Sequence, residues 1–121
     1  DLAVQRVTLS SPAINRRTTK IRVQVRNVGE LAAGSTGLIV ECFLIETEKK
    51  RRPCPGSNPP ARLHVPGLAV NAGRTFEIPL SRFLLPVGRP GHYEIKALLD
   101  TRGKVIENNE YNNSGVLRFE Y

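Results

Sequence analysis

Residues 20–26 read Lys-Ile-Arg-Val-Gln-Val-Arg, an unbroken alternation of polar and apolar side chains. Ile21, Val23 and Val25 fall on one side of an extended chain, and charged or amide side chains fall on the other. A period of two residues is that of a β-strand with one face in a core and one in water. Residues 18–28 are therefore predicted to form such a strand.

Runs of the same kind recur along the chain. Leu2 and Val4 begin one run, which slips by one residue before it resumes at Val7 and Leu9, as a β-bulge would require. Residues 36–47 are apolar on both sides, as expected of a central strand. The remaining runs are 62–65, 75–80, 92–99 and 116–121. Because Gly, Pro and Asn clusters separate these short strands, the chain is predicted to be all-β, an immunoglobulin- or fibronectin-like antiparallel β-sandwich of about seven strands.

Tyr93 stands at the start of the sixth predicted strand, directly after Gly91 and His92. Immunoglobulin-like sandwiches keep a tyrosine at this place, and its hydroxyl bonds to backbone upstream. A core aromatic side chain without that bond is the alternative.

Length and composition set further bounds. The chain has 121 residues, of which 40% are hydrophobic, so residues 1–121 are expected to form a single domain. No apolar run approaches the roughly 18 residues that cross a bilayer. Because the chain has no Met and no leader-like start, it is expected to be part of a longer or processed protein.

The chain is basic: 18 Lys and Arg outnumber 11 Asp and Glu, which gives a net charge of +7. The densest run is Lys49-Lys50-Arg51-Arg52, and residues 49–60 are expected to be a basic, Pro-rich loop insertion. The outward side of the second strand could extend this patch through Lys20, Arg22 and Arg26.

Such a patch could bind phosphate or sulfate groups. Nucleic acid is disfavoured, because no aromatic side chains alternate with these cations to stack on bases. A solvated, non-binding surface is the alternative.

Cys42 and Cys54 are the only two cysteines. In an exported protein they are predicted to form a disulfide, which closes a ring of about 13 residues and contributes about 3 kcal/mol in the chain-entropy model. Alternatively, Cys42 is a small buried apolar residue. Their spacing does not suggest zinc or redox chemistry.

The acidic and amide residues near the end of the chain are a candidate Ca²⁺ site. Asp100, Glu107, Glu110 and Asn112 carry the oxygen ligands that calcium prefers. The sequence has no Asp-x-Asp-x-Asp-Gly loop, and Asp100 could simply open a turn that continues to Gly103. Both interpretations stay open at this stage.

No arrangement of residues points to catalysis. His64 and His92 are the only histidines, and neither belongs to a nucleophile or metal-binding motif. The chain is therefore predicted not to be an enzyme.

Several motifs together are similar to those of one known family. They are Asp1-Leu2-Ala3-Val4, residues 21–29, Val65-Pro66-Gly67-Leu68, Gly91-His92-Tyr93 and the Glu-x-x-Glu-x-Asn-Asn tail at 107–113. With these motifs the chain resembles CARDB, the cell-adhesion-related domain found in bacteria, over nearly its whole length.

The resemblance implies a non-catalytic accessory or adhesion module of an exported bacterial protein, located outside the cell or in its envelope. The expected partners are a protein, a glycan or neighbouring domains of the same chain. The competing hypothesis is a polyanion binder for anionic glycan, lipid or nucleic acid, which uses Lys49–Arg52 and the second-strand face. Salt dependence separates the two, because only the second should weaken steeply with salt.

Overall fold

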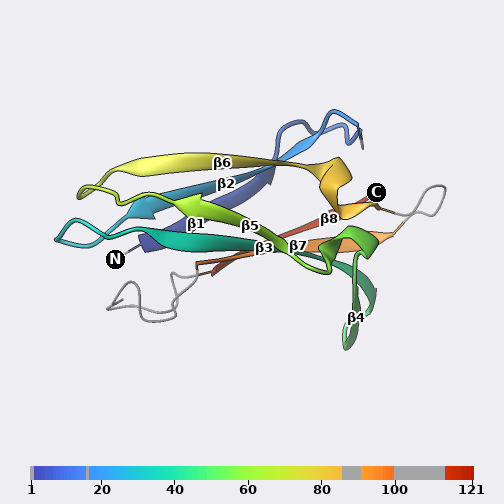
Figure 1. The fold of residues 1–121 in the computed structure, drawn as a ribbon. Coiled ribbons are helices and arrows are strands. Elements are labelled where there is room, and N and C mark those ends of the chain that lie inside the picture. Colours follow the sequence, from blue (N-terminus) through green and yellow to red (C-terminus); the bar gives the residue numbers. More distant parts are fainter. Residues whose placement is uncertain (1, 16, 86–90, 100–113) are drawn as a thin grey trace.

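The structure, a computed structural model, describes residues 2–15, 17–85, 91–99 and 114–121. Two antiparallel sheets pack face to face, as Figure 1 shows. The described residues form eight strands and two short 3₁₀ turns, with no α-helix. The predicted all-β sandwich is confirmed.

The smaller sheet has three strands in the order β1-β2-β6. They are β1 (Leu2–Leu9), β2 (Lys20–Asn27) and β6 (Gly73–Pro79). The inward side chains of β2, Ile21, Val23 and Val25, are all fully buried. The alternation in residues 20–26 therefore assigned both the strand and its buried side correctly.

β1 contains the irregularity that its sequence predicts. Val4 pairs with Val25, but the next pair along the strands joins Arg6 to Gln24, so Gln5 is the extra residue of a bulge. With the extra residue Val7 turns inward, where it is 8% exposed, while Arg6 faces out and is exposed. The bulge thus keeps β1 amphipathic although its apolar positions change parity.

The larger sheet is built around β3 (Thr36–Thr47). On one side β3 pairs with β7 (His92–Leu99), which in turn pairs with β8 (Ser114–Glu120). On the other side two short strands share its edge in succession: β5 (Ala61–Val65) pairs with the first part of β3, and β4 (Lys50–Pro53) with the last part.

β4 lies within the stretch that was expected to be a basic loop. The structure makes residues 50–53 a strand and 55–57 a 3₁₀ turn, η1 (Pro55–Ser57). The physical reason is the length of β3: β5 pairs with it only from Thr36 to Val40, and the chain returning after Thr47 pairs with the remainder. With β4 the described residues form eight strands, whereas the sequence predicted about seven.

The core fills the space between the sheets and closes at one end with a second 3₁₀ turn, η2 (Leu80–Phe83). Leu80 and Phe83 of this turn are fully buried, and they belong to the same core cluster as Ile95 and Ala97 of β7. No helix in the described part of the chain is long and apolar enough to cross a membrane.

Asn27 organises the turn after β2 from a buried position. Its side-chain amide donates to the carbonyl oxygens of Leu31 at 2.8 Å and Leu68 at 3.0 Å. Its side-chain oxygen accepts from the backbone N–H of Gly29 at 3.0 Å. Because the side chain is 0% exposed, these bonds satisfy polar groups that water does not reach.

Candidate binding surfaces

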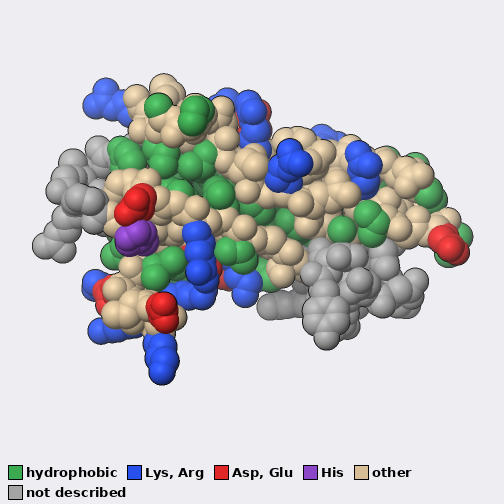
Figure 2. All heavy atoms as spheres, turned by 180° about the vertical axis from the view of Figure 1, so that it is seen from behind, with side chains coloured by type: hydrophobic (Ala, Val, Ile, Leu, Met, Phe, Trp, Pro, Cys, Tyr) green, Lys and Arg blue, Asp and Glu red, His purple; other side chains and the backbone are tan. Residues whose placement is uncertain are grey.

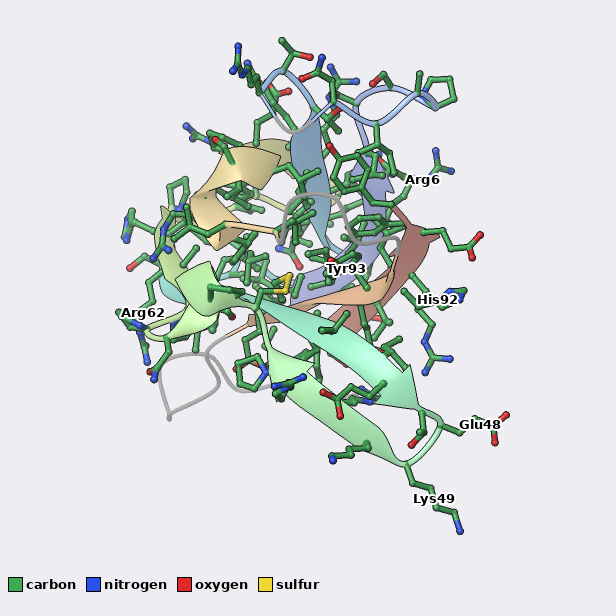
Figure 3. The ribbon with its side chains drawn as sticks, turned by 90° about the vertical axis from the view of Figure 1, so that its right-hand side faces the viewer. Arg6, Glu48, Lys49, Arg62, His92 and Tyr93 are labelled. Atoms are coloured by element: carbon green, nitrogen blue, oxygen red, sulfur yellow. A yellow bond between two sulfur atoms is a disulfide. The ribbon has the colours of Figure 1, made fainter. Side chains whose placement is uncertain are left out.

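The cations of Lys49–Arg52 lie on the hairpin formed by the end of β3 and β4. Lys50 Nζ lies 3.5 Å from a carboxylate oxygen of Glu46, and Arg52 pairs with the same carboxylate. Arg51 pairs with Glu94. Three of the four cations thus have an acidic partner, which lowers the positive potential available to a ligand. Lys49 lies at the tip, and Figure 3 shows its side chain pointing away from the sandwich.

Glu94 is the most deeply buried carboxylate among the described residues, at 1% exposure. It lies on the outward side of β7, and Arg118 of β8 is its cross-strand neighbour. Arg118 Nε donates to Glu94 Oε1 at 3.1 Å, and Arg51 donates to Oε2. Two guanidinium groups from two strands therefore cover one carboxylate on the outer side of the larger sheet.

A second group of cations lies on the outward side of the smaller sheet. Lys20, Arg22 and Arg26 alternate along β2 and are all exposed. Arg6 joins them from β1 because of the bulge. We call this surface the cationic face, and its members are Arg6, Lys20, Arg22 and Arg26 with the polar Thr8, Gln24 and Thr75.

The structure does not bring the two predicted cation groups together. β2 belongs to the smaller sheet and β4 to the larger one, and their outward sides point in opposite directions. In Figure 3, Arg6 lies with the smaller sheet and Lys49 at the far end of the view. Figure 2 likewise shows Lys and Arg side chains at the protruding hairpin and, separately, along the opposite margin. The single extended patch suggested by the sequence is therefore two separate surfaces.

Cys42 and Cys54 are joined by a disulfide in the structure, with their Cα atoms 5.3 Å apart. Both residues are buried, at 0% and 1% exposure. The backbone N–H of Cys54 donates to the Cys42 carbonyl at 2.9 Å, and that of Cys42 donates to Ser57 Oγ at 3.0 Å. The bond therefore ties β3 to the chain between β4 and η1.

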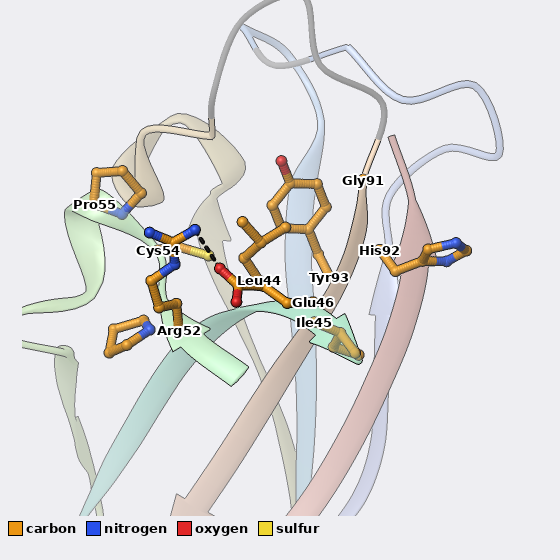
Figure 4. Close-up of a pocket in the computed structure, with 10 residues that line it drawn as sticks. Leu44, Ile45, Glu46, Arg52, Cys54, Pro55, Gly91, His92 and Tyr93 are labelled. Carbon is orange, nitrogen blue, oxygen red and sulfur yellow. Dashed lines mark ion pairs between the residues drawn. The ribbon is translucent and has the colours of Figure 1, made fainter. Parts of the chain in front are cut away.

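A hollow of about 630 Å³ opens beside this disulfide, between β4 and the start of β7 (Figure 4). Leu44, Cys54 and Tyr93 line it, and the ion pair between Glu46 and Arg52 lies across it. The lining is more apolar than polar, and its charged pair is mutually neutralised. Such a hollow suits a side chain or a sugar ring better than a charged reactant.

Tyr93 is a buried core aromatic, 1% exposed and stacked on Phe119 with ring centroids 5.6 Å apart. Burial raises the pKa of the Tyr93 hydroxyl above its ordinary value, and the nearby Tyr121 raises it further. Residues 86–90 upstream of it lie outside the described part, so the predicted tyrosine-corner hydrogen bond stays a prediction.

The histidines lie on exposed positions of different strands. His64 is on β5, and His92 Nε2 lies 3.2 Å from Glu120 Oε1 at the start of β7. Within the described ranges, no three His, Cys, Asp or Glu side chains come together as a metal site would need. The proposed calcium ligands Asp100, Glu107, Glu110 and Asn112 all lie outside the described residues. That hypothesis stays a prediction, which a thermal melt with and without EGTA tests.

Comparison with known proteins adds the family. The family model of CARDB matches residues 1–116, nearly the whole sandwich. The chain belongs to the CARDB family. No curated protein matches its sequence.

Solved structures support the fold of this CARDB domain. One is a CARDB domain from Pyrococcus furiosus in complex with di-metal ions, which is 22% identical with a TM-score of 0.63; the match covers 98% of this chain and 84% of that one. Another is β-glucosidase 3B from Thermotoga neapolitana in complex with α-D-glucose, 12% identical with a TM-score of 0.53. The match covers all of this chain but only 16% of the glucosidase. At such identities the likeness concerns the fold alone.

Two residues of these candidate surfaces were not found from the sequence. Arg6 was not grouped with the cations of the second strand, although the slip between Val4 and Val7 already implies that Arg6 points outward. Glu94 occupies a polar position in an alternating strand, and no local signal distinguishes it from an exposed glutamate. Its burial depends on Arg51, which is 43 residues away in sequence.

Proposed function

We propose that this CARDB domain is a non-catalytic contact or spacer module of an exported bacterial protein, located outside the cell or in its envelope, which binds a protein or glycan partner. Membership of the CARDB family over residues 1–116 carries the proposal. The fold adds support, because a sandwich of similar topology makes up only a small part of a much longer glucosidase chain.

The surfaces of the described part of the domain support the proposed contact role. In the part of the chain that the structure describes, the titratable groups are engaged in ion pairs or spread over separate strands. Glu46 and Glu94 are each held by two cations, and His92 faces Glu120. A general acid or base needs a free group aimed into a pocket that receives substrate. The cationic face and the hollow beside Cys54 instead offer flat and concave areas for binding.

The test is a binding assay with a parallel assay for turnover. The folded domain is immobilised and exposed to a panel of purified neutral polysaccharides, acidic polysaccharides and bacterial surface proteins. The eluate is analysed for new reducing ends and new peptide termini. We expect reversible, saturable retention of at least one panel member and no product above the level of a heat-unfolded control.

Two results would contradict the proposal. Product formation in proportion to the amount of folded domain would mean that it is an enzyme. Absence of an export signal from the reading frame of the parent protein would contradict the proposed location. Failure to retain any panel member would remove the contact role and leave the spacer role.

A further inference from the structure

The cationic face carries an almost continuous band of positive charge. Along β2, Lys20, Arg22 and Arg26 occupy alternate positions, and the uncharged Gln24 interrupts them. Arg6 lies directly across from Gln24 in the strand pairing, so the neighbouring strand places a cation beside the interruption. Residues two apart on a strand are roughly 6.5–7 Å apart, so the band extends roughly 20 Å along the sheet.

Little acidic charge offsets this band. In the described ranges its one ion pair joins Arg22 Nε to Glu77 Oε2 at 3.1 Å, with both side chains about half exposed. At such exposure the pair is weak, and an anionic ligand could compete with Glu77 for the guanidinium group. Arg6, Lys20 and Arg26 are exposed. The face therefore has a net positive charge that a ligand can reach.

The polar side chains between the cations indicate the chemistry of the ligand. Thr8 lies across from Arg22, and Thr75 lies across from Gln24. Hydroxyl and amide groups thus alternate with guanidinium groups over a flat sheet surface. The outward positions of β1, β2 and β6 carry no aromatic side chain, so this face has no platform on which bases could stack.

We infer that the cationic face binds a linear acidic polysaccharide, whose carboxylate or sulfate groups pair with the cations while its hydroxyls bond to the threonines and Gln24. The inference rests on the proposed contact function and names the class of ligand. It also excludes the Lys49–Arg52 hairpin from the site, because that hairpin lies on the opposite side and most of its charge is paired.

The test compares two double charge reversals with the same net charge. Arg6→Glu/Arg26→Glu removes two cations from the face. The matched control, Lys49→Glu/Lys50→Glu, removes two exposed cations from the tip of the hairpin between β3 and β4, and Figure 3 shows Lys49 far from Arg6. The probes are dextran sulfate, polygalacturonate, neutral dextran and a short DNA duplex. Affinities are measured by calorimetry at about 50 mM and about 200 mM salt, a range over which ion-pair binding changes steeply.

We expect the wild-type domain to bind one or both acidic polysaccharides and not neutral dextran. Arg6→Glu/Arg26→Glu should bind roughly tenfold more weakly at the lower salt, with a flatter salt dependence, because two ion pairs are lost. The control should differ from wild type by less than about twofold, since its changes lie on the hairpin of the larger sheet and exposed charges far from the ligand are screened by salt. The neutral variant Arg6→Gln/Arg26→Gln should fall between them, and all variants should keep the wild-type melting midpoint.

Three results would overturn the inference. Equal weakening in both double reversals would mean that net charge, and not this face, attracts polyanions. Tighter binding of the DNA duplex, lost in the face variant, would assign the face to nucleic acid. Absence of binding to both acidic polysaccharides would also overturn it. In that case retention of a neutral glycan or a protein would still support the proposed contact function, so the two failures are distinguishable.

Discussion

Arg118 donates from Nε to a carboxylate oxygen of Glu94 at 3.1 Å, across the pairing of β8 with β7. The carboxylate is buried, whereas 65% of the Arg118 side chain is exposed. The pair is therefore asymmetric. Without Glu94 the arginine can return to water, but if apolar side chains of similar length replace the two arginines, they still cover the carboxylate and leave it unpaired.

This asymmetry predicts an order of stabilities. Glu94→Gln should lower the free energy of unfolding by only about 1–2 kcal/mol, because both arginines can be solvated. Arg51→Met/Arg118→Met should cost more, about 3 kcal/mol, because a buried charge loses its partners. The triple variant that adds Glu94→Leu should recover most of this loss. Urea unfolding measures all three, and equal costs for the first two variants would contradict the asymmetry.

From the disulfide between Cys42 and Cys54 we predict the mass change of the protein on reduction and the effect of removing the bond on its stability. Reduction under denaturing conditions should add two hydrogens to the mass of the protein. Cys42→Ala/Cys54→Ala should lower the free energy of unfolding by about 3 kcal/mol, mainly because the unfolded chain loses its ring. An unchanged mass would mean that the two thiols are free in the purified protein.

Asn27 should be among the most sensitive polar positions of the domain. Asn27→Ala removes two donated hydrogen bonds and leaves the Leu68 carbonyl without this donor, at a cost of about 2–3 kcal/mol. The control is its neighbour Val28, which is 44% exposed, and Val28→Ala should change the free energy of unfolding by less than about 0.5 kcal/mol. Similar losses in the two variants would show that the turn does not depend on the Asn27 side chain.

Tyr93 predicts a loss of stability at alkaline pH. Its hydroxyl is neutral in both states at neutral pH, and folding raises its pKa above the value of about 10 in the unfolded chain. The stabilisation that Tyr93 gives through its neutral, buried hydroxyl is therefore fully present at pH values below the unfolded pKa. It declines as the pH rises through the higher pKa of the folded state. Denaturant unfolding at a series of pH values up to about 11 should show this decline in wild type and a flatter curve in Tyr93→Phe. Parallel curves would mean that other groups cause the decline.

The sequence predicts most of the sandwich because its strands bury one side each. Ile21, Val23 and Val25 identify both the strand and its inner side, and the parity change after Val4 predicts the bulge. β4 was missed because Lys50–Arg52 has no apolar alternation, and its pairing depends on the length of β3. Pairing through side chains is likewise invisible in local sequence, so the neutralised hairpin and the buried Glu94 could not be predicted from charge runs.

The division of one edge of β3 between β4 and β5 has a consequence for aggregation through edge strands. An unbroken edge of twelve residues would offer a long row of free backbone groups to any neighbouring copy. Here that row is covered by two short strands of four and five residues, and Pro53 ends the first of them. Neither of these short strands offers a long free edge on that side to which a strand of another molecule could pair. At this edge of the larger sheet, a second copy of the domain would therefore find little continuous backbone with which to pair.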